Sequence, residues 1–169
     1  MKILEKHISK NLPCYTNIKF NPKYITIHET EIGILDNEEY KNVDYYYSLL
    51  ANPQRGREKV GYHFLVDDTN AYEFIPSNIV TFHTGTVEGN YNSIGIERCV
   101  YTGINHMNAI ILQARLTAFL MKKYNIPIEN VRTHKSWSGK ECPARLLNNI
   151  FISFEDFIKL TDSEYKKIK

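Results

Sequence analysis

The segment THKSWSGKECPA places an imidazole, His134, and a thiol, Cys142, on either side of Lys140. Gly139 permits a tight turn between the two, and Pro143 fixes the backbone directly after the thiol. A segment of this kind can bring both side chains to one point in space. It is the most informative feature of the sequence, because it holds two side chains able to bind a metal within one short segment.

A second histidine, His28, lies near the end of the run YITIHET, in which β-forming residues alternate. The pattern predicts a strand in which Ile25 and Ile27 point toward the core. His28 then shares the opposite face with Tyr24 and Thr26 and points toward a cleft. The run turns charged after the imidazole, as expected where a strand delivers a ligand to the edge of a sheet.

The three side chains are of the types that bind zinc. Zinc prefers four ligands, so His28, His134 and Cys142 would leave one position for water, which is typical of catalytic rather than structural zinc. Each residue has a simpler interpretation when taken alone: a hydrogen-bonded structural histidine, a surface histidine and a buried free cysteine. The combination favours a site for one zinc ion.

The composition excludes several classes of protein. At 169 residues and 43% hydrophobic, the chain is long enough for one compact domain with a sizeable core. A formal charge of +2 and the lack of a long lysine or arginine run argue against nucleic acid as a partner. We expect no membrane insertion, because no apolar run approaches the ~18 residues of a membrane span. The opening MKILEKHISKNLP also lacks the apolar core of a signal peptide.

The three cysteines, Cys14, Cys99 and Cys142, are too few and too scattered for a disulfide framework. A bridge between Cys14 and Cys142 is compatible with the spacing. A free or metal-bound thiol is the simpler interpretation.

The first half of the chain alternates predicted strands and helices. The opening residues, broken by Pro13 and Pro22, predict an extended or partly helical arm. Asp36 is a candidate N-cap for a helix that ends before Pro53. The runs GYHFLVDD and AYEFIP predict a hairpin across the turn-forming DDTN. TFHTGTVEGNYN predicts a surface loop.

The second half begins with a strand, SIGIERCVY, whose two faces carry different residues. Ile94, Ile96 and Val100 share one face, and the other carries Gly95, Glu97 and Cys99. A long helix is predicted from about Asn108, with Lys122 and Lys123 in its last turn. After the THKSWSGKECPA loop, Ser153 and Asp156 predict a capped start to a final helix. Interleaved strands and helices favour an α/β or α+β domain with helices packed on the faces of one sheet.

Several separated motifs occur in a fixed order: TIHET, GYHFLVDD, FHTG, NSIGIE and THKSWSGKECPARLL. Together they resemble the zinc-dependent N-acetylmuramoyl-L-alanine amidases of type 2, which are related to peptidoglycan recognition proteins and phage endolysins. The resemblance implies a single domain with a central mixed β-sheet flanked by helices. We divide the chain into an N-terminal arm (1–22), a zinc amidase catalytic domain (23–150) and a C-terminal helix (151–169).

The resemblance also implies roles for individual residues. The zinc ligands correspond here to His28, His134 and Cys142. Glu97 and Lys140 correspond to catalytic residues, and some relatives use instead a tyrosine at the position of Tyr62. Because this chain has both Glu97 and Tyr62, either one is a candidate for the proton transfer. His83 in FHTG resembles a position in the substrate cleft, so we expect it to contact substrate.

Physical chemistry favours Glu97, because a carboxylate near an activated water can accept its proton and return it to the leaving nitrogen. Gly95, on the same strand face, leaves room for substrate. Lys140 and Tyr62 could both stabilise an oxyanion. The simpler interpretations are a surface glutamate paired with Arg98, a solvated lysine and a tyrosine packed on a half-buried strand.

We therefore expect hydrolysis of the amide between N-acetylmuramic acid and the L-alanine of peptidoglycan. One alternative is a cell-wall peptidase with Cys142 as nucleophile and His134 or His28 as base, although Pro143 and the preceding SGKE favour a ligand in a loop. Another is a non-catalytic peptidoglycan-binding module, whose representatives typically lack the cysteine ligand. We further expect a monomer: a phage lysin released from the host cytoplasm to the wall, or an extracellular autolysin if the chain is part of a secreted protein.

Overall fold

The computed structural model describes residues 1–30, 41–52 and 59–168. Its strands are β1 (Ile3–Glu5), β2 (Tyr24–Ile27), β3 (Phe64–Val66), β4 (Ala71–Glu73), β5 (Ser93–Arg98) and β6 (Val131–Thr133). Its helices are α1 (Val43–Ala51), α2 (Val87–Asn92), α3 (His106–Tyr124), α4 (His134–Ser138), α5 (Ala144–Leu147) and α6 (Phe154–Lys167), with a 3-10 turn, η2 (Ile128–Asn130).

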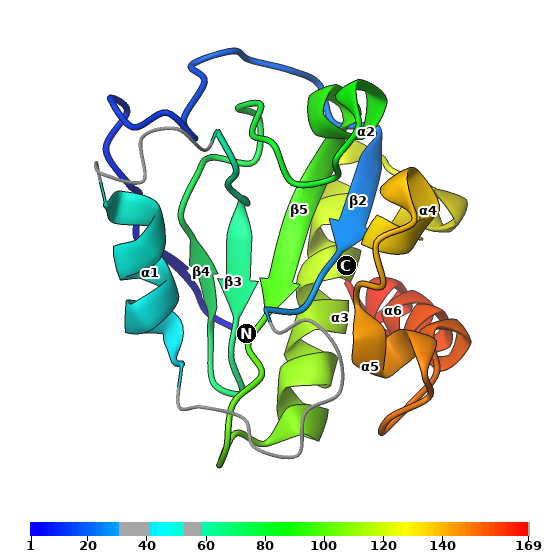
Figure 1. Ribbon diagram of the computed structural model, residues 1–169. Coiled ribbons are helices and arrows are strands. Elements are labelled where there is room, and N and C mark those ends of the chain that lie inside the picture. Colours follow the sequence, from blue (N-terminus) through cyan, green and yellow to red (C-terminus); the bar gives the residue numbers. More distant parts are fainter. Residues whose placement is uncertain (31–40, 53–58, 169) are drawn as a thin grey trace.

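Within these described ranges, the strands form one six-stranded sheet in the order β1-β4-β3-β5-β2-β6 (Figure 1). The hairpin partners β3 and β4 are antiparallel, and all other neighbours are parallel. The sheet is therefore mixed. This confirms the prediction of a single α/β (α+β) domain with a central mixed sheet flanked by helices.

Both faces of the sheet are covered, as parallel strands require. Ile25 and Ile27 of β2 and Ile96 of β5 belong to a buried cluster that includes the apolar stripe of α3. Helix α6 packs on α3 and extends this cluster. On the opposite face, Leu65 and Phe74 pack with α1 and with the segment before β2 (Figure 1). His28 follows Ile27 and so points away from α3, as the alternation predicted.

Side-chain caps explain where the two longest helices begin. Asn105 accepts a hydrogen bond from the Asn108 backbone, so α3 begins two residues before the predicted start. Lys122 and Lys123 occupy its last turn, as predicted. The predicted capping residues of α6 are confirmed, because the Ser153 hydroxyl accepts from the Asp156 backbone N–H.

Two sequence predictions for helices and loops need correction. Asp36 lies outside the described residues, and α1 begins at Val43 with Asn42 as its cap. The run TFHTGTVEGNYN is not a surface loop, since it contains α2, capped by Thr86, and its first residues are buried. The Asn90 side chain accepts from the backbones of His83 and Thr84, which ties this segment down.

The N-terminal residues join the sheet rather than lying apart from it. Strand β1 pairs with β4, and the isolated bridge between Lys19 and Ile79 adds a second attachment. The division at residues 22 and 150 stays a prediction. None of Cys14, Cys99 and Cys142 is in a disulfide, so the bridge between Cys14 and Cys142 is not formed. None of the described helices combines the length and the apolar character that crossing a membrane requires.

Candidate metal centre

The register between β2 and β6 brings two distant histidines together. Ile27 is paired with Thr133, and the strands are parallel, so the next residues, His28 and His134, lie side by side. His28 stays in extended pairing with β5, because its backbone N–H donates to the Ile96 carbonyl. The convergence therefore depends on strand register.

Residues 133–144 are not a single loop, since His134 is the first residue of the short helix α4. Thr133 caps this helix through the Ser136 backbone, and Gly139 ends it with a φ of 79°. The Trp137 indole N–H donates to the Thr26 hydroxyl, which fixes α4 against β2. The chain then returns through Cys142, which lies just before α5.

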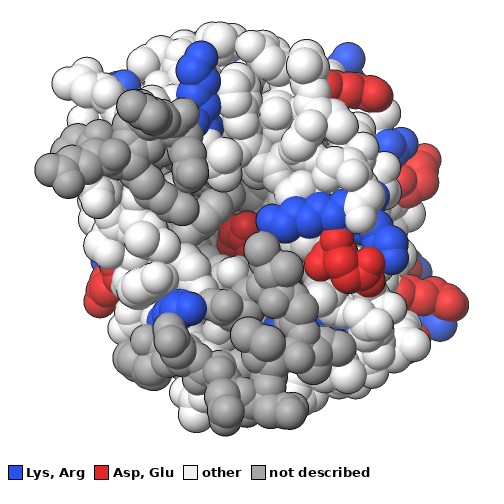
Figure 2. All heavy atoms as spheres, viewed as in Figure 1, with Lys and Arg blue, Asp and Glu red and all other residues white. Residues whose placement is uncertain are grey.

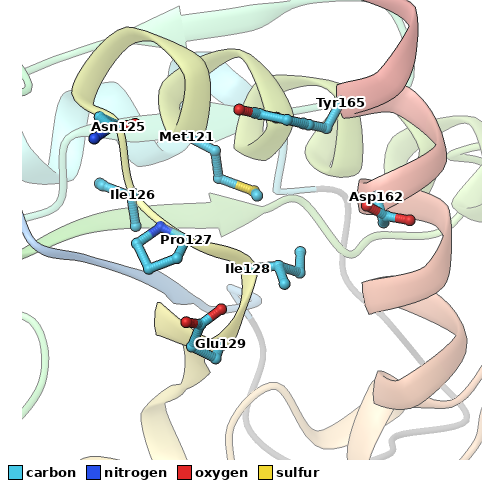
Figure 3. Close-up of a pocket in the computed structure, with 8 residues that line it drawn as sticks. All are labelled: Met121, Asn125, Ile126, Pro127, Ile128, Glu129, Asp162 and Tyr165. Carbon is cyan, nitrogen blue, oxygen red and sulfur yellow. The ribbon is translucent and has the colours of Figure 1, made fainter.

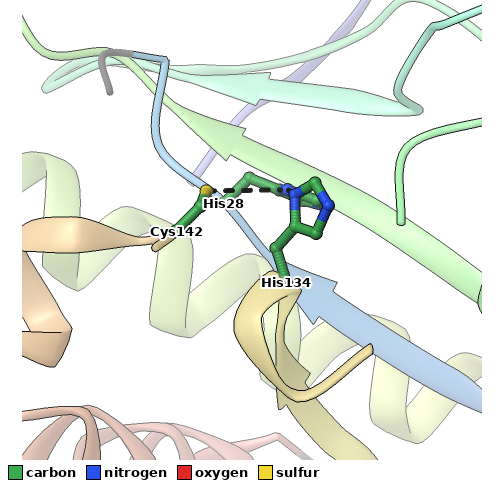
Figure 4. A group of neighbouring side chains, drawn as sticks. All are labelled: His28, His134 and Cys142. Carbon is green, nitrogen blue, oxygen red and sulfur yellow. Dashed lines mark hydrogen bonds between the residues drawn. The ribbon is translucent and has the colours of Figure 1, made fainter. Parts of the chain in front are cut away.

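The three predicted ligands converge. Nδ1 of His28 lies 3.1 Å from Nδ1 of His134 and 3.8 Å from Sγ of Cys142 (Figure 4). Ligating atoms of the three residues all lie within 4.8 Å of one another, and the residues are 1%, 8% and 4% exposed. The sequence prediction that these three side chains come to one point is therefore met.

This geometry fits a tetrahedral metal ion. Zinc bonds of about 2.0 to 2.1 Å to nitrogen and 2.3 Å to sulfur place neighbouring ligand atoms about 3.3 to 3.6 Å apart. The His28 to His134 and His28 to Cys142 separations of 3.1 and 3.8 Å are close to these values. A buried group of two imidazoles and one thiol with this spacing can hold a metal ion.

The protonation states also suit metal binding. Burial, and then the nearby His83 and His134 rings, hold the pKa of His28 well below its usual value. Burial, with the charge of Lys140, lowers the pKa of His134 to about 4. Both rings are therefore neutral and have a free nitrogen lone pair. Burial raises the pKa of the Cys142 thiol to about 12, so this cysteine needs a cation beside it to become a thiolate.

Glu97 lies beside the three ligands. It comes from β5, and its Oε1 is 4.0 Å from Nδ1 of His28. Its Oε2 is buried and has no hydrogen-bond partner within the described part of the chain. Burial raises the pKa of Glu97 to about 8, and the charge of Lys140 partly opposes that rise. The simpler pairing with Arg98 is not formed, because Arg98 binds Glu29 instead.

Lys140 is exposed, on the segment between α4 and Cys142. It precedes Cys142 by two residues, and its charge lowers the pKa values of both Glu97 and His134. Figure 2 shows a basic side chain extending toward an acidic one in a hollow on this face of the molecule. The site thus combines a buried carboxyl group with a nearby cation.

Tyr62 and Glu97 line the same cavity, of about 160 Å³. The other lining residues come mainly from α1 and the chain before β3: Thr30, Tyr46, Leu49, Leu50 and Val60. The Tyr62 ring also packs against Phe74, with ring centres 5.9 Å apart. Tyr62 therefore lies beside Glu97 and is also packed on the sheet.

His83 is buried beside His28, and its expected contact with substrate stays a prediction. It is 7% exposed, and its Nδ1 is 3.0 Å from Nε2 of His28, while its Nε2 is 3.2 Å from the Ser93 carbonyl. The space above Gly95 is filled by this ring, because a Cβ on Gly95 would lie 2.7 Å from its Nδ1. Gly95 thus makes room for His83 rather than for substrate, and His83 contacts a predicted ligand.

Three buried charges that the sequence analysis missed support the site. The Glu29 carboxylate accepts from the Arg98 guanidinium at 2.6 Å and from the Arg145 guanidinium at 3.2 Å. All three side chains are buried. Glu29 follows His28 and Arg98 follows Glu97, while Arg145 lies just beyond Cys142. We call this group the Glu29 triad; it joins the three segments that carry site residues.

A second pocket, of about 480 Å³, lies between the end of α3, η2 and α6 (Figure 3). It is lined by Met121, Asn125, Ile126, Pro127, Ile128, Glu129, Asp162 and Tyr165. It shares no residue with the candidate metal centre.

Comparisons with known proteins agree with the motifs. The family model described as N-acetylmuramoyl-L-alanine amidase matches residues 19–145. The amidase XlyA of Bacillus subtilis is 36% identical over 142 residues, which cover 83% of this chain and 44% of XlyA. The amidase CwlH of Bacillus subtilis is 34% identical over 149 residues, which cover 86% of this chain and 56% of CwlH. The chain thus spans about half the length of these curated relatives.

A solved structure titled mutant endolysin from Bacillus subtilis has the same fold. Its TM-score is 0.83 and its identity 31%, and the match covers 95% of this chain and 99% of that one. The chain belongs to the N-acetylmuramoyl-L-alanine amidase family, the one that its motifs resemble.

Proposed function

We propose that this protein is a zinc-dependent N-acetylmuramoyl-L-alanine amidase. Its substrate is the amide bond between the lactyl group of N-acetylmuramic acid and the L-alanine of the peptidoglycan stem peptide. One Zn²⁺ ion is held by His28, His134 and Cys142. The observation that carries the proposal is the buried group of these three side chains with the Glu97 carboxyl beside it.

Zinc, when bound, activates water near neutral pH and polarises a carbonyl group. Glu97 accepts a proton from the attacking water and returns it to the departing amine. Two features suit it to this task. Its pKa of about 8 lies near neutral pH, and its buried Oε2 has no hydrogen-bond partner among the described residues.

Lys140 contributes positive charge where negative charge develops on the scissile carbonyl oxygen. Its position next to the site also favours the ionised form of Glu97, so one side chain supports both roles. Tyr62 offers a phenol in the cavity that it shares with Glu97. We assign the proton transfer to Glu97 and a supporting hydrogen bond to Tyr62.

The cavity beside Glu97 is where we place part of the substrate. Its lining from α1 is largely apolar, which suits the methyl group of L-alanine better than the hydroxyl groups of a sugar. We infer that the peptide side of the scissile bond, rather than the glycan, faces α1.

A thiol enzyme fits the site less well. A nucleophilic cysteine needs a lowered pKa, whereas burial raises the pKa of Cys142 to about 12. A non-catalytic binding module would have no use for an isolated carboxyl group next to two imidazoles. The Cys142 ligand and the position of Glu97 therefore favour catalysis.

The similarity to a protein titled endolysin leads us to propose that the chain acts on bacterial cell wall as a lysin. We propose that it does so as a monomer, because each group used above comes from a single chain. We expect further segments of a longer parent protein, where present, to add affinity for a particular wall.

The identity of the cleaved bond tests the proposal. Purified peptidoglycan is digested with the wild-type protein, and the soluble products are identified by mass spectrometry. The expected products are stem peptides with a free N-terminal L-alanine and glycan strands with unsubstituted muramic acid. Cleavage within the stem peptide or between sugars would contradict the proposal.

A further inference from the structure

His63 and His83 are buried side by side behind the candidate metal centre, with ring centres 5.7 Å apart. Neither is one of the three predicted ligands. They differ in their hydrogen-bond partners. His83 bonds to the ring of His28, whereas the partners of His63 among the described residues are the backbone groups of Ile79 and Gly95. This difference separates a role at the metal centre from a role in packing.

The tautomer of His83 follows from its partners. The Ser93 carbonyl, 3.2 Å from Nε2 of His83, can only accept, so Nε2 carries the hydrogen. The ring is 7% exposed, and an imidazole with its one hydrogen at Nε2 has an acceptor at Nδ1. Nδ1 lies 3.0 Å from Nε2 of His28. The hydrogen in that bond must come from His28.

The same logic fixes His28. Its Nε2–H donates to His83, so its Nδ1 has a free lone pair. That Nδ1 is the atom that lies 3.1 Å from Nδ1 of His134 and 3.8 Å from Sγ of Cys142. His134 repeats the pattern, because its ring bonds to the Thr84 backbone while its Nδ1 faces His28. Two lone pairs that face each other are stabilised by a cation between them.

We propose that His83 is a positioning residue that fixes the tautomer and orientation of His28, so that Nδ1 of His28 is the metal ligand. This inference rests on the metal site of the proposed function. Hydrogen bonds to the outer nitrogen of a ligating histidine orient the ring and increase its basicity, and their loss typically weakens metal binding about 10- to 100-fold. Gly95 contributes to this arrangement of His83 and His28, because any larger residue at position 95 would displace the His83 ring.

Two substitutions at residue 83 separate the acceptor from the rest of the ring. In H83Q, the side-chain amide can still reach the Ser93 carbonyl but provides no acceptor at the position of Nδ1. In H83N, the shorter amide oxygen lies near that position and can accept from His28. H63Q is the matched control, because glutamine can keep the bond that Nε2 of His63 makes to the Ile79 carbonyl at 2.8 Å.

The experiment measures Zn²⁺ affinity by competition with a chromophoric chelator, with circular dichroism to verify folding. We expect H83Q to bind Zn²⁺ about 10- to 100-fold more weakly than wild type, with H83N and H63Q much closer to wild type. When Co²⁺ replaces Zn²⁺, its absorption spectrum in H83Q should differ from that in the wild-type protein, whereas the spectrum in H63Q should not. Wild-type affinity in H83Q, or equal losses in H83Q and H63Q, would overturn the inference.

A second measurement needs no variant. Nitrogen-15 chemical shifts of the zinc-loaded wild-type protein report which nitrogen of each histidine carries hydrogen. We expect His28 to be protonated at Nε2 and bound to metal at Nδ1. The opposite tautomer would overturn the role of His83 while leaving the amidase proposal intact. A wild-type protein that binds no Zn²⁺ would overturn both.

Discussion

Oε1 of Glu97 lies 4.0 Å from Nδ1 of His28, the same nitrogen that faces His134 and Cys142. The carboxyl group thus lies next to the candidate metal centre and also lines the cavity that it shares with Tyr62. Its other oxygen is buried, with no hydrogen-bond partner in the described segments, and its pKa is raised to about 8. A group held in this costly state is typical of a functional site.

We expect Glu97→Gln to reduce turnover of peptidoglycan about 10²- to 10⁴-fold, the range for loss of a general base. The amide keeps the size of the side chain and removes its capacity to take up a proton. Zinc content should not change, because Glu97 is not one of the three ligands. Release of soluble muropeptides and metal analysis check the two parts. Glu88→Gln, on the exposed face of α2, is the control. Full activity of Glu97→Gln would transfer the proton role to Tyr62.

The two buried thiols Cys142 and Cys99 offer a matched pair. Cys142 lies 3.8 Å from Nδ1 of His28, whereas Cys99 belongs to the apolar cluster under α1. We expect Cys142→Ser to lose bound zinc and activity together. Cys99→Ser should keep the metal and lose only stability, because it places a hydroxyl in an apolar cluster. Elemental analysis after dialysis distinguishes the two, and metal retention by Cys142→Ser would exclude Cys142 as a ligand.

Lys140→Met should change the pH dependence of the reaction. Glu97 must be ionised to accept a proton, and the Lys140 charge lowers its pKa. Removing that charge raises the pKa, so a smaller fraction of Glu97 is ionised at neutral pH. We expect the rising limb of kcat/KM against pH to move to higher pH, with activity partly regained in alkali. Lys135→Met is the control, since Lys135 pairs with Glu141. A loss that is equal at every pH would argue against this coupling.

The Glu29 triad should be sensitive to a change of one charge. Glu29→Gln leaves the buried guanidinium groups of Arg98 and Arg145 without their shared carboxylate. Breaking a buried pair in this way costs about 3 to 5 kcal/mol, whereas an exposed pair contributes about 0 to 1 kcal/mol. We expect a loss of the first size in urea unfolding of the zinc-loaded protein. Asp162→Asn, which breaks an exposed pair with Lys166, should change little. Equal effects of the two substitutions would contradict a structural role for the triad.

Local patterns were sufficient to predict much of the fold. Alternating residues in YITIH placed His28 opposite the core, and the DDTN turn gave the β3 and β4 hairpin. Capping residues marked the start of α6. The start of α1 was missed, because Asn42 caps the helix. Helix α2 was missed because its segment is rich in glycine and asparagine, which predict a loop, while the Thr86 cap stabilises a short helix there.

The convergence of the site depends on contacts that no local pattern contains. His28 meets His134 through the pairing of Ile27 with Thr133, two residues far apart in the chain. Gly95 suggested open space for substrate, whereas the His83 ring fills that space, and this contact joins two segments that no local pattern relates. No local pattern marks the three charges of the Glu29 triad, which are buried where three segments of the chain meet.

The most direct test of the account is whether zinc restores amide cleavage to a demetallated sample. Wild-type protein is stripped with a chelator, dialysed, and assayed for stem peptides with a free N-terminal L-alanine before and after Zn²⁺ is added back. We expect these products to disappear on stripping and to return when about one Zn²⁺ per chain is bound. Continued release of the same products by a sample shown to hold no metal would contradict it.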